Sequence, residues 1–102
     1  MLMVAVYRTP HGIMALISDE DLVGRSFFDQ EKGLALLLPE SIYGGKPASE
    51  EEALEAMKAA SIIVVTGERA VDLAVRSGFL HPDSVVRIHG VPHAQVYKIR
   101  VA

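Results

Sequence analysis

Residues 61–78, Ser-Ile-Ile-Val-Val-Thr-Gly-Glu-Arg-Ala-Val-Asp-Leu-Ala-Val-Arg-Ser-Gly, decide the fold of this chain. The β-branched run from Ile62 to Val65 predicts a strand that is buried on both faces. After Thr66-Gly67, apolar residues recur at helical spacing from Ala70 to Val75, and Gly78 ends the predicted helix. A strand that enters a helix through such a turn directs backbone N–H groups at one point, where an anion can bind.

The composition predicts a single domain over residues 1–102 with a real hydrophobic core. Half of the residues are hydrophobic and the formal net charge is -3, which gives no general attraction to nucleic acid or to an anionic membrane. The chain has no cysteine, so disulfides, thiolate catalysis and cysteine-ligated metal sites are excluded. No apolar run is long enough to span a bilayer, and we expect a cytoplasmic protein without membrane contact.

The N-terminal part of the chain predicts a β-hairpin, a short turn and a further strand. Two apolar segments, Leu2 to Arg8 and Ile13 to Ser18, flank Thr9-Pro10-His11-Gly12, which is typical of a hairpin turn. The acidic run Asp19-Glu20-Asp21 suits the start of a short helical turn, where the helix dipole favours negative charge. A strand is expected at Leu34 to Leu38, because Pro39 ends that apolar run.

The second half of the chain alternates between helices and strands. Ser49 and Glu52 form a capping box for a helix over 50–60. With the opening stretch, this gives a βαβαβ order over segments 34–38, 50–60, 62–65, 68–77 and 85–88, which favours parallel pairing. We expect an α/β fold, with α+β as the alternative: a small mixed sheet extended antiparallel by the N-terminal hairpin and by a C-terminal edge strand at 96–101.

Candidate ligand-binding residues follow the predicted strands, because ligands bind beyond the carboxyl ends of parallel strands. Thr66-Gly67 and His89-Gly90 follow two of these strands, and the flexible loop Tyr43-Gly44-Gly45 follows a third. We expect the three segments to meet at one edge of the sheet. The full candidate set is Tyr43, Gly44, Gly45, Thr66, Gly67, Glu68, Arg69, His89, Gly90, His93 and Gln95.

These candidates also have purely structural interpretations. Thr66 suits an ordinary N-cap, and Glu68 and Arg69 suit ordinary charges in the first turn of a helix. The di-glycine segment at 44–45 suits a link between a strand and the next helix. The ligand-binding and structural interpretations therefore both remain open for this set.

Two histidines lie in the C-terminal segment, and Gly90 and Pro92 exclude a helix there, so we predict a loop from His89 to Gln95. A two-histidine metal site would need a further ligand, for which Glu68 is the only nearby acid. Hydrogen bonding of His93 and Gln95 to loop backbone is the simpler account. We predict no metal, no cofactor and no catalytic residue.

The C-terminal fifth of the chain is locally basic, because no acid occurs from Ser84 to Ala102. Cations on an exposed strand face can contact phosphates, and Tyr97 or Tyr43 can stack on a base. The alternative is a solvated edge strand without a partner. The candidate nucleic-acid residues are Arg69, Arg87, Lys98 and Arg100.

Several segments carry a family resemblance. They are Gly24-Arg25-Ser26-Phe27, Tyr43-Gly44-Gly45, Ser49 to Ala53, Gly67-Glu68-Arg69-Ala70-Val71 and Gly90-Val91-Pro92-His93-Ala94-Gln95. In this order they resemble a small archaeal family, the domain of unknown function number four-two-four. The resemblance implies an archaeal, cytoplasmic, stand-alone domain associated with translation or ribosome-related genes. It transfers no catalytic residue, because the family has no established activity.

Three functional hypotheses follow. The leading one is a non-enzymatic module that binds RNA or ribosomal components. The first alternative is an enzyme or small-ligand sensor that holds a phosphate or carboxylate at Thr66-Gly67, with His93 as an acid–base group oriented by Glu68. The second alternative is a homo-oligomeric interaction protein, such as a homodimer joined through an unpaired edge strand.

Overall fold

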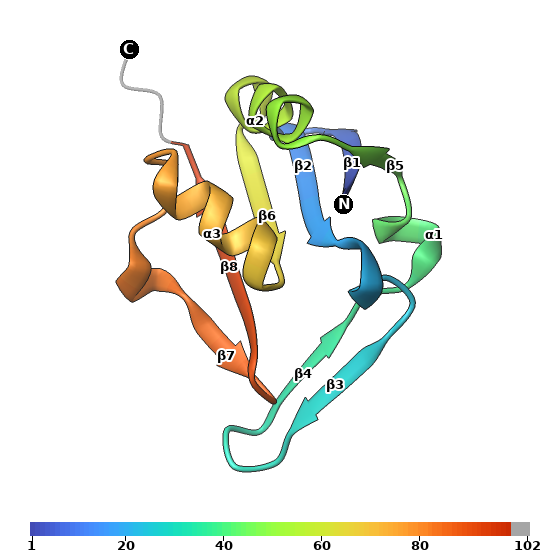
Figure 1. The fold of residues 1–102 in the computed structure, drawn as a ribbon, viewed down its shortest axis with the longest axis vertical. Helices are drawn as coiled ribbons and strands as arrows, with labels where there is room; N and C mark the ends of the chain where they lie inside the picture. Colours follow the sequence, from blue (N-terminus) through green and yellow to red (C-terminus); the bar gives the residue numbers. More distant parts are fainter. Residues whose placement is uncertain (99–102) are drawn as a thin grey trace.

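A six-stranded mixed sheet forms the centre of the molecule, with the strand order β5-β1-β2-β6-β8-β7 (Figure 1). The computed structural model describes residues 1–98. The strands of this sheet are β1 (Leu2–Thr9), β2 (Gly12–Asp19), β5 (Lys46–Ala48), β6 (Ile62–Thr66), β7 (Val86–Ile88) and β8 (Val91–Tyr97). Among these strands of residues 1–98, β2 and β6 alone pair in parallel, and all other neighbours are antiparallel.

Helices α2 (Glu50–Ala59) and α3 (Glu68–Arg76) pack on one face of this sheet. The predicted capping box begins α2: the Glu52 N–H donates to the Ser49 hydroxyl, and the Ser49 N–H donates to the Glu52 carboxylate. Residues of both helices and of β2, β6 and β8 form the main core, which includes Ile17, Met57, Ile63, Val65, Leu73 and Ala94. No helix within residues 1–98 is long and apolar enough to cross a membrane.

A separate two-stranded hairpin covers part of the other face of the sheet. It consists of β3 (Ser26–Asp29) and β4 (Leu34–Leu37), with the short helix α1 (Glu40–Tyr43) after it. Its inner residues Phe27 and Leu36 pack with Leu22 and Leu38 against Ile88 of β7. Two 3-10 turns, Glu20–Leu22 and Pro82–Ser84, complete the regular structure.

The predicted mixed sheet, N-terminal hairpin and C-terminal edge strand are confirmed, but the strand at the edge of the sheet is β7, and β8, which contains Val96 and Tyr97, lies between β6 and β7. The parallel pairing that we expected from the βαβαβ order is wrong outside β2 and β6. Strand 34–38 does not enter the main sheet, because it pairs with β3 instead. Within residues 1–98, the parallel crossover thus joins β2 and β6, and a long insertion separates these two strands.

The predicted loop from His89 to Gln95 is also wrong, because β8 begins at Val91. His89 and Gly90 both have positive φ, 51° and 80°, which is the signature of a two-residue type I′ hairpin turn. Pro92 is tolerated because it is opposite Arg87 at a non-hydrogen-bonded position, one residue from the Ile88–Val91 pair that closes the turn. Of the predicted strand 96–101, Val96 and Tyr97 belong to β8, and residues 99–101 lie outside the described residues.

Replacing an isoleucine of the core and an exposed isoleucine tests where the stability of the fold resides. Ile17 is 0% exposed and Ile42 is 47% exposed. Ile17→Ala should lower the free energy of unfolding by about 2–5 kcal/mol, because it leaves a cavity between the sheet and the helices. Ile42→Ala should change it by less than about 0.5 kcal/mol. Urea unfolding followed by circular dichroism measures both, and equal losses would contradict this core assignment.

Candidate functional site

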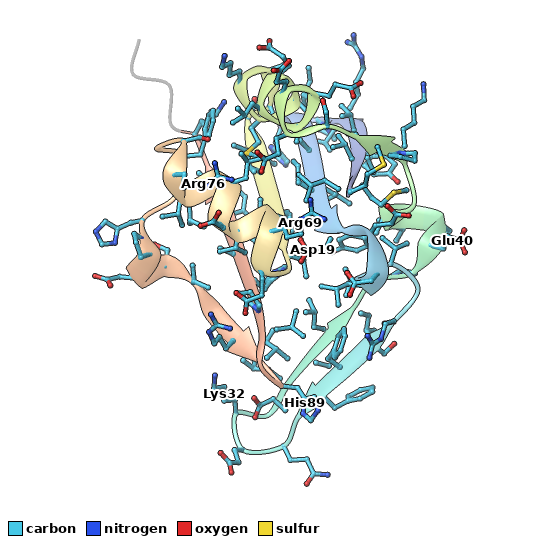
Figure 2. All side chains as sticks on the ribbon, in the orientation of Figure 1. Asp19, Lys32, Glu40, Arg69, Arg76 and His89 are labelled. Atoms are coloured by element: carbon cyan, nitrogen blue, oxygen red, sulfur yellow. The ribbon has the colours of Figure 1, made fainter. Side chains whose placement is uncertain are left out.

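The start of α3 holds an anion that belongs to the chain itself. The buried Asp19 carboxylate, at the end of β2, accepts hydrogen bonds from the backbone N–H of Arg69 at 3.1 Å and of Ala70 at 2.9 Å. Figure 2 shows Asp19 beside Arg69 at this helix end. Gly67 precedes the helix with φ 106°, and a Cβ at this position would collide with the Asp19 carboxyl group.

This arrangement argues against an external anion at Thr66-Gly67. Two of the backbone N–H groups that lack a partner within the helix already donate to Asp19. A carboxylate at this position also interacts favourably with the helix dipole. Sequence reasoning missed this role of Asp19, because its acidic neighbours suggested a local helical turn. The parallel pairing of β2 with β6 would have revealed it, since it aligns Ser18 with Thr66.

Thr66 and His93 form a polar pair on the opposite face of the sheet from Asp19. They are cross-strand partners, and Thr66 Oγ1 and His93 Nδ1 share a hydrogen bond of 2.9 Å. Thr66 is therefore a buried strand residue and not the N-cap that its place in the sequence suggests. Burial lowers the pKa of His93, which keeps the half-buried imidazole neutral near pH 7. Ser18, next to Thr66, has a buried hydroxyl without a hydrogen-bond partner among the described residues.

The remaining polar candidates of this region are engaged by neighbouring side chains. Glu68 forms a 2.7 Å ion pair with Arg87, whose guanidinium also donates to the Gly90 carbonyl at 3.1 Å. Gln95 lies exposed on β8, where its side-chain oxygen accepts from the Tyr97 hydroxyl at 3.1 Å. Glu68 therefore pairs with Arg87 and not with His93, which was its expected partner in the enzyme hypothesis.

His89 belongs to a different contact, at the tip of the β3–β4 hairpin. The His89 N–H donates to Asp29 Oδ2 at 3.0 Å, and Lys32 Nζ donates to the Arg87 carbonyl. Figure 2 shows Lys32 and His89 at this end of the molecule. The backbone hydrogen bonds from His89 and Lys32 lower the pKa of Asp29. This pair of contacts, here called the hairpin clasp, ties residues 29–32 to residues 87–89.

Two of the candidate nucleic-acid cations also serve the fold. Lys98 Nζ donates to the carbonyls of Met57 at 2.6 Å and Lys58 at 3.0 Å, which caps the C-terminal end of α2. It also lies 5.3 Å from the centre of the Phe79 ring. Arg87 is held by Glu68, and Arg100 lies outside the described residues. Arg69 is exposed, and it is the member of this set within residues 1–98 whose side chain forms no hydrogen bond or ion pair with the described residues.

The di-glycine loop lies at the other edge of the sheet, so the expected meeting of three segments at one edge is wrong. Tyr43 is half-buried against Ala5, Leu16 and Val64, and burial raises the pKa of its hydroxyl. A Cβ on Gly44 would collide with the Glu40 carbonyl, and one on Gly45 with the Val4 carbonyl. These glycines thus allow the chain to pass close to α1 and β1.

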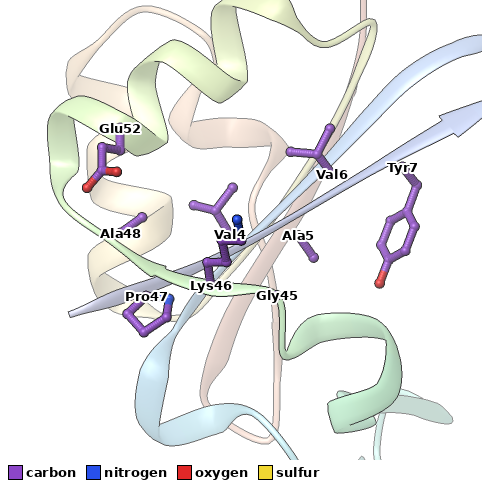
Figure 3. A pocket seen from close by; sticks show the side chains of 9 residues that line it. All are labelled: Val4, Ala5, Val6, Tyr7, Gly45, Lys46, Pro47, Ala48 and Glu52. Atoms are coloured by element: carbon purple, nitrogen blue, oxygen red, sulfur yellow. The ribbon is translucent and has the colours of Figure 1, made fainter.

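A groove of about 570 Å³ opens beside this loop, along the outer side of β1 (Figure 3). Strand β5 pairs only with Leu2–Val4, so the second half of β1 has no strand neighbour on this side within residues 1–98. The groove is lined by Val4, Ala5, Val6, Tyr7, Gly45, Lys46, Pro47, Ala48 and Glu52.

The direction of the β1 backbone groups follows from the ladder. The Ser61 N–H donates to the Ile13 carbonyl, so Ile13 faces β6, and the alternate residues of β2 bond to β1. Met14 is opposite Tyr7 in this register. Tyr7 therefore bonds to β2, whereas Val6 and Arg8 direct their N–H and C=O groups toward the groove. These residues form what we call the open edge, Val6–Arg8.

Within the described residues, the edges at β7 and β5 are protected. At β7, the hairpin clasp occupies the Arg87 carbonyl and the adjacent His89 N–H. At β5, Lys46 and Ala48 bond to β1, and Pro47 between them has no N–H to offer outward. Two stretches of the sheet lack an outer strand neighbour within residues 1–98. One is the end of β8, because β7 pairs only with Val91–His93, and the other is the open edge. Of the two, the open edge lies beside the groove of about 570 Å³.

Removing the internal anion tests the assignment of Asp19. Asp19→Ala should lower the free energy of unfolding by about 2–3 kcal/mol, because two backbone donors lose a charged acceptor. Asp19→Asn keeps one acceptor oxygen and should lose less. Asp21→Ala, an exposed acid two residues away, is the matched control and should remain near wild type. Urea unfolding measures all three, and a wild-type value for Asp19→Ala would show that the carboxylate does not cap α3.

The lowered pKa of His93 predicts a pH dependence of stability. Below the unfolded pKa of about 6.5, the unfolded chain takes up a proton that folded His93 resists, so acidification favours unfolding. The free energy of unfolding should therefore fall as the pH drops from about 6.5 through the folded pKa. In His93→Gln this part of the slope should disappear, while His11→Gln, in the exposed turn, retains it. Denaturation between pH 4 and 8 measures the slopes, and identical slopes in wild type and His93→Gln would contradict the prediction.

Comparison with known proteins shows a family without an assigned activity. A crystal structure of an uncharacterized conserved protein from Methanopyrus kandleri is similar, with a TM-score of 0.77 and 21% sequence identity over 99% of this chain and 96% of that chain. Its archaeal source agrees with the archaeal origin that the sequence resemblance implies. No curated protein matches this chain. The family model described as "Protein of unknown function (DUF424)" matches residues 7–99, so the chain belongs to this family.

Proposed function

We propose that this domain is a cytoplasmic, non-enzymatic binding module that receives an extended polypeptide strand along the open edge, Val6–Arg8. The observation that carries the proposal is a strand of the central sheet with one half unpaired beside a groove of about 570 Å³. Strand addition uses the free main-chain donors and acceptors of such an edge for affinity, and side-chain pockets beside it for specificity.

The groove offers different chemistry on its two sides. Val6 is 54% exposed and lies on the α2 side of the sheet, where Glu52 also lines the groove. Tyr7 points to the other side, where its hydroxyl donates to the Ile42 carbonyl (Figure 3). A partner strand that alternates its side chains would thus place one next to Val6 and Glu52 and the next beside Tyr7.

The polar residues that suggested an enzyme or a small-ligand sensor have structural contacts instead. Asp19 fills the helix start, Arg87 engages Glu68, and Thr66 engages His93. The acid–base pair that the enzyme hypothesis needs is thus divided between two structural contacts. Stabilising the sheet and α3 explains these side chains fully.

The RNA-binding hypothesis finds less support than a protein partner. Lys98 caps α2 and Arg87 is paired with Glu68, so contact with phosphates would cost these internal interactions. Among residues 1–98, Arg69 is then the main candidate for a contact with phosphate. The experiment below therefore also tests for binding of RNA and ribosomal components.

Affinity capture from an extract of the native host, with matched variants, tests the proposed function. Val6→Lys places a charge on the open edge, which blocks strand addition. Leu37→Lys makes the same change at equal exposure, 53% against 54%, on the β3–β4 hairpin. A protein partner should be recovered with wild type and Leu37→Lys, and lost with Val6→Lys.

The RNA arm of the same experiment uses Arg69→Ala. If RNA is recovered with wild type at low salt, is lost steeply as salt rises and falls further in Arg69→Ala, the nucleic-acid function is favoured instead. Failure to recover any protein whose binding depends on Val6 would overturn the strand-binding function.

A further inference from the structure

We infer that the strand received at the open edge is β1 of a second copy of this chain, antiparallel to the first and related to it by a two-fold axis at Tyr7. This inference rests on the proposed function, since it names the partner of the same edge. A two-fold contact uses one patch twice, so the edge must complement itself. Three features of the structure meet that requirement.

The first feature is the placement of the backbone groups. The N–H and C=O groups of Val6 and Arg8 point away from β2, and those of Tyr7 point toward β2, as the ladder between β1 and β2 requires. With Tyr7 on the axis, Val6 is opposite the partner's Arg8, and Arg8 is opposite the partner's Val6. Both pairs are hydrogen-bonded pairs of an antiparallel ladder, so the outward N–H and C=O groups of both residues find a partner.

The second feature is the length of the free edge. Strand β5 occupies the edge as far as Val4, where Gly45 approaches the Val4 carbonyl. At the other end, β1 stops at Thr9 and turns through Pro10 into β2. In the two-fold register Ala5 faces the partner's Thr9, so each hairpin ends where the other copy's β5 begins. The overlap therefore fills the free edge without displacing β5.

The third feature is the side-chain chemistry. The partner's Arg8 enters the groove on the side of Val6 and Glu52, so a cation and its alkyl stem meet an exposed apolar residue and a carboxylate. The partner's Tyr7 lies opposite Tyr7 at a non-hydrogen-bonded position, where facing side chains are closest and aromatic pairs are stabilising. The contact occupies the open edges of both copies at once, so it does not propagate beyond the dimer.

Light scattering coupled to size exclusion tests the stoichiometry with the full chain. Wild type and Leu37→Lys should elute as dimers, and Val6→Lys should have a dissociation constant raised more than about tenfold or be monomeric. Circular dichroism confirms that each variant is folded. Dimers of equal affinity in all three would place the interface elsewhere and overturn the inference.

A disulfide test reads the register directly, because the chain has no cysteine of its own. Tyr7→Cys should form an intermolecular disulfide under mild oxidation, since the axis brings the two residues opposite each other. Val86→Cys, on exposed β7, is the control and should remain reduced or react only slowly at high concentration. Equal, slow crosslinking of both variants would overturn the inference.

These outcomes separate the two proposals. A monomeric wild type without Tyr7→Cys crosslinking ends the second-copy inference. If such a monomer still captures a different protein in a manner that depends on Val6, the strand-binding function stands. If it captures none, both fail.

Discussion

The parallel pairing of β2 with β6 is the constraint on which the rest of the molecule depends. It brings the carboxyl ends of two strands side by side, so Asp19 reaches the N–H groups that begin α3. The same register aligns Ser18, Thr66 and His93 in one row across the sheet. Because the insertion between these strands contains a hairpin and two helices, a single pairing organises both faces of the sheet.

The charged side chains around the two main helices act within the molecule itself. Asp19 satisfies donors at the start of α3, and Lys98 satisfies acceptors at the end of α2, each with the sign that the helix dipole favours. Glu68 and Arg87 neutralise each other. The main chain of β1, in contrast, keeps hydrogen-bonding groups available at the open edge.

Local patterns revealed the elements, whereas long-range pairing determined the site. The capping box of α2, the β-branched run of β6 and Gly67 are all readable from neighbours in the sequence. The sequence of strand 34–37 is equally compatible with a place in the main sheet and with a separate hairpin, since its partner β3 has no distinctive sequence pattern. The role of Asp19 depends on residues 50 and 51 positions away, which no local signal indicates. Pro92 suggested a loop because its harmless position depends on the type I′ turn before it.

The hydrogen bonds of the hairpin clasp go to backbone groups and not to side chains of the segment 87–89. Asp29 and Lys32 contact only an N–H and a C=O of the segment 87–89, across 60 and 55 positions of sequence. The hairpin therefore supplies the side chains of the clasp, and the β7–β8 turn supplies only backbone groups in the right positions. Substitutions at positions 87 and 89 are thus compatible with the clasp as long as the backbone shape of the turn persists, whereas Ile88 is constrained by its packing against Phe27 and Leu36.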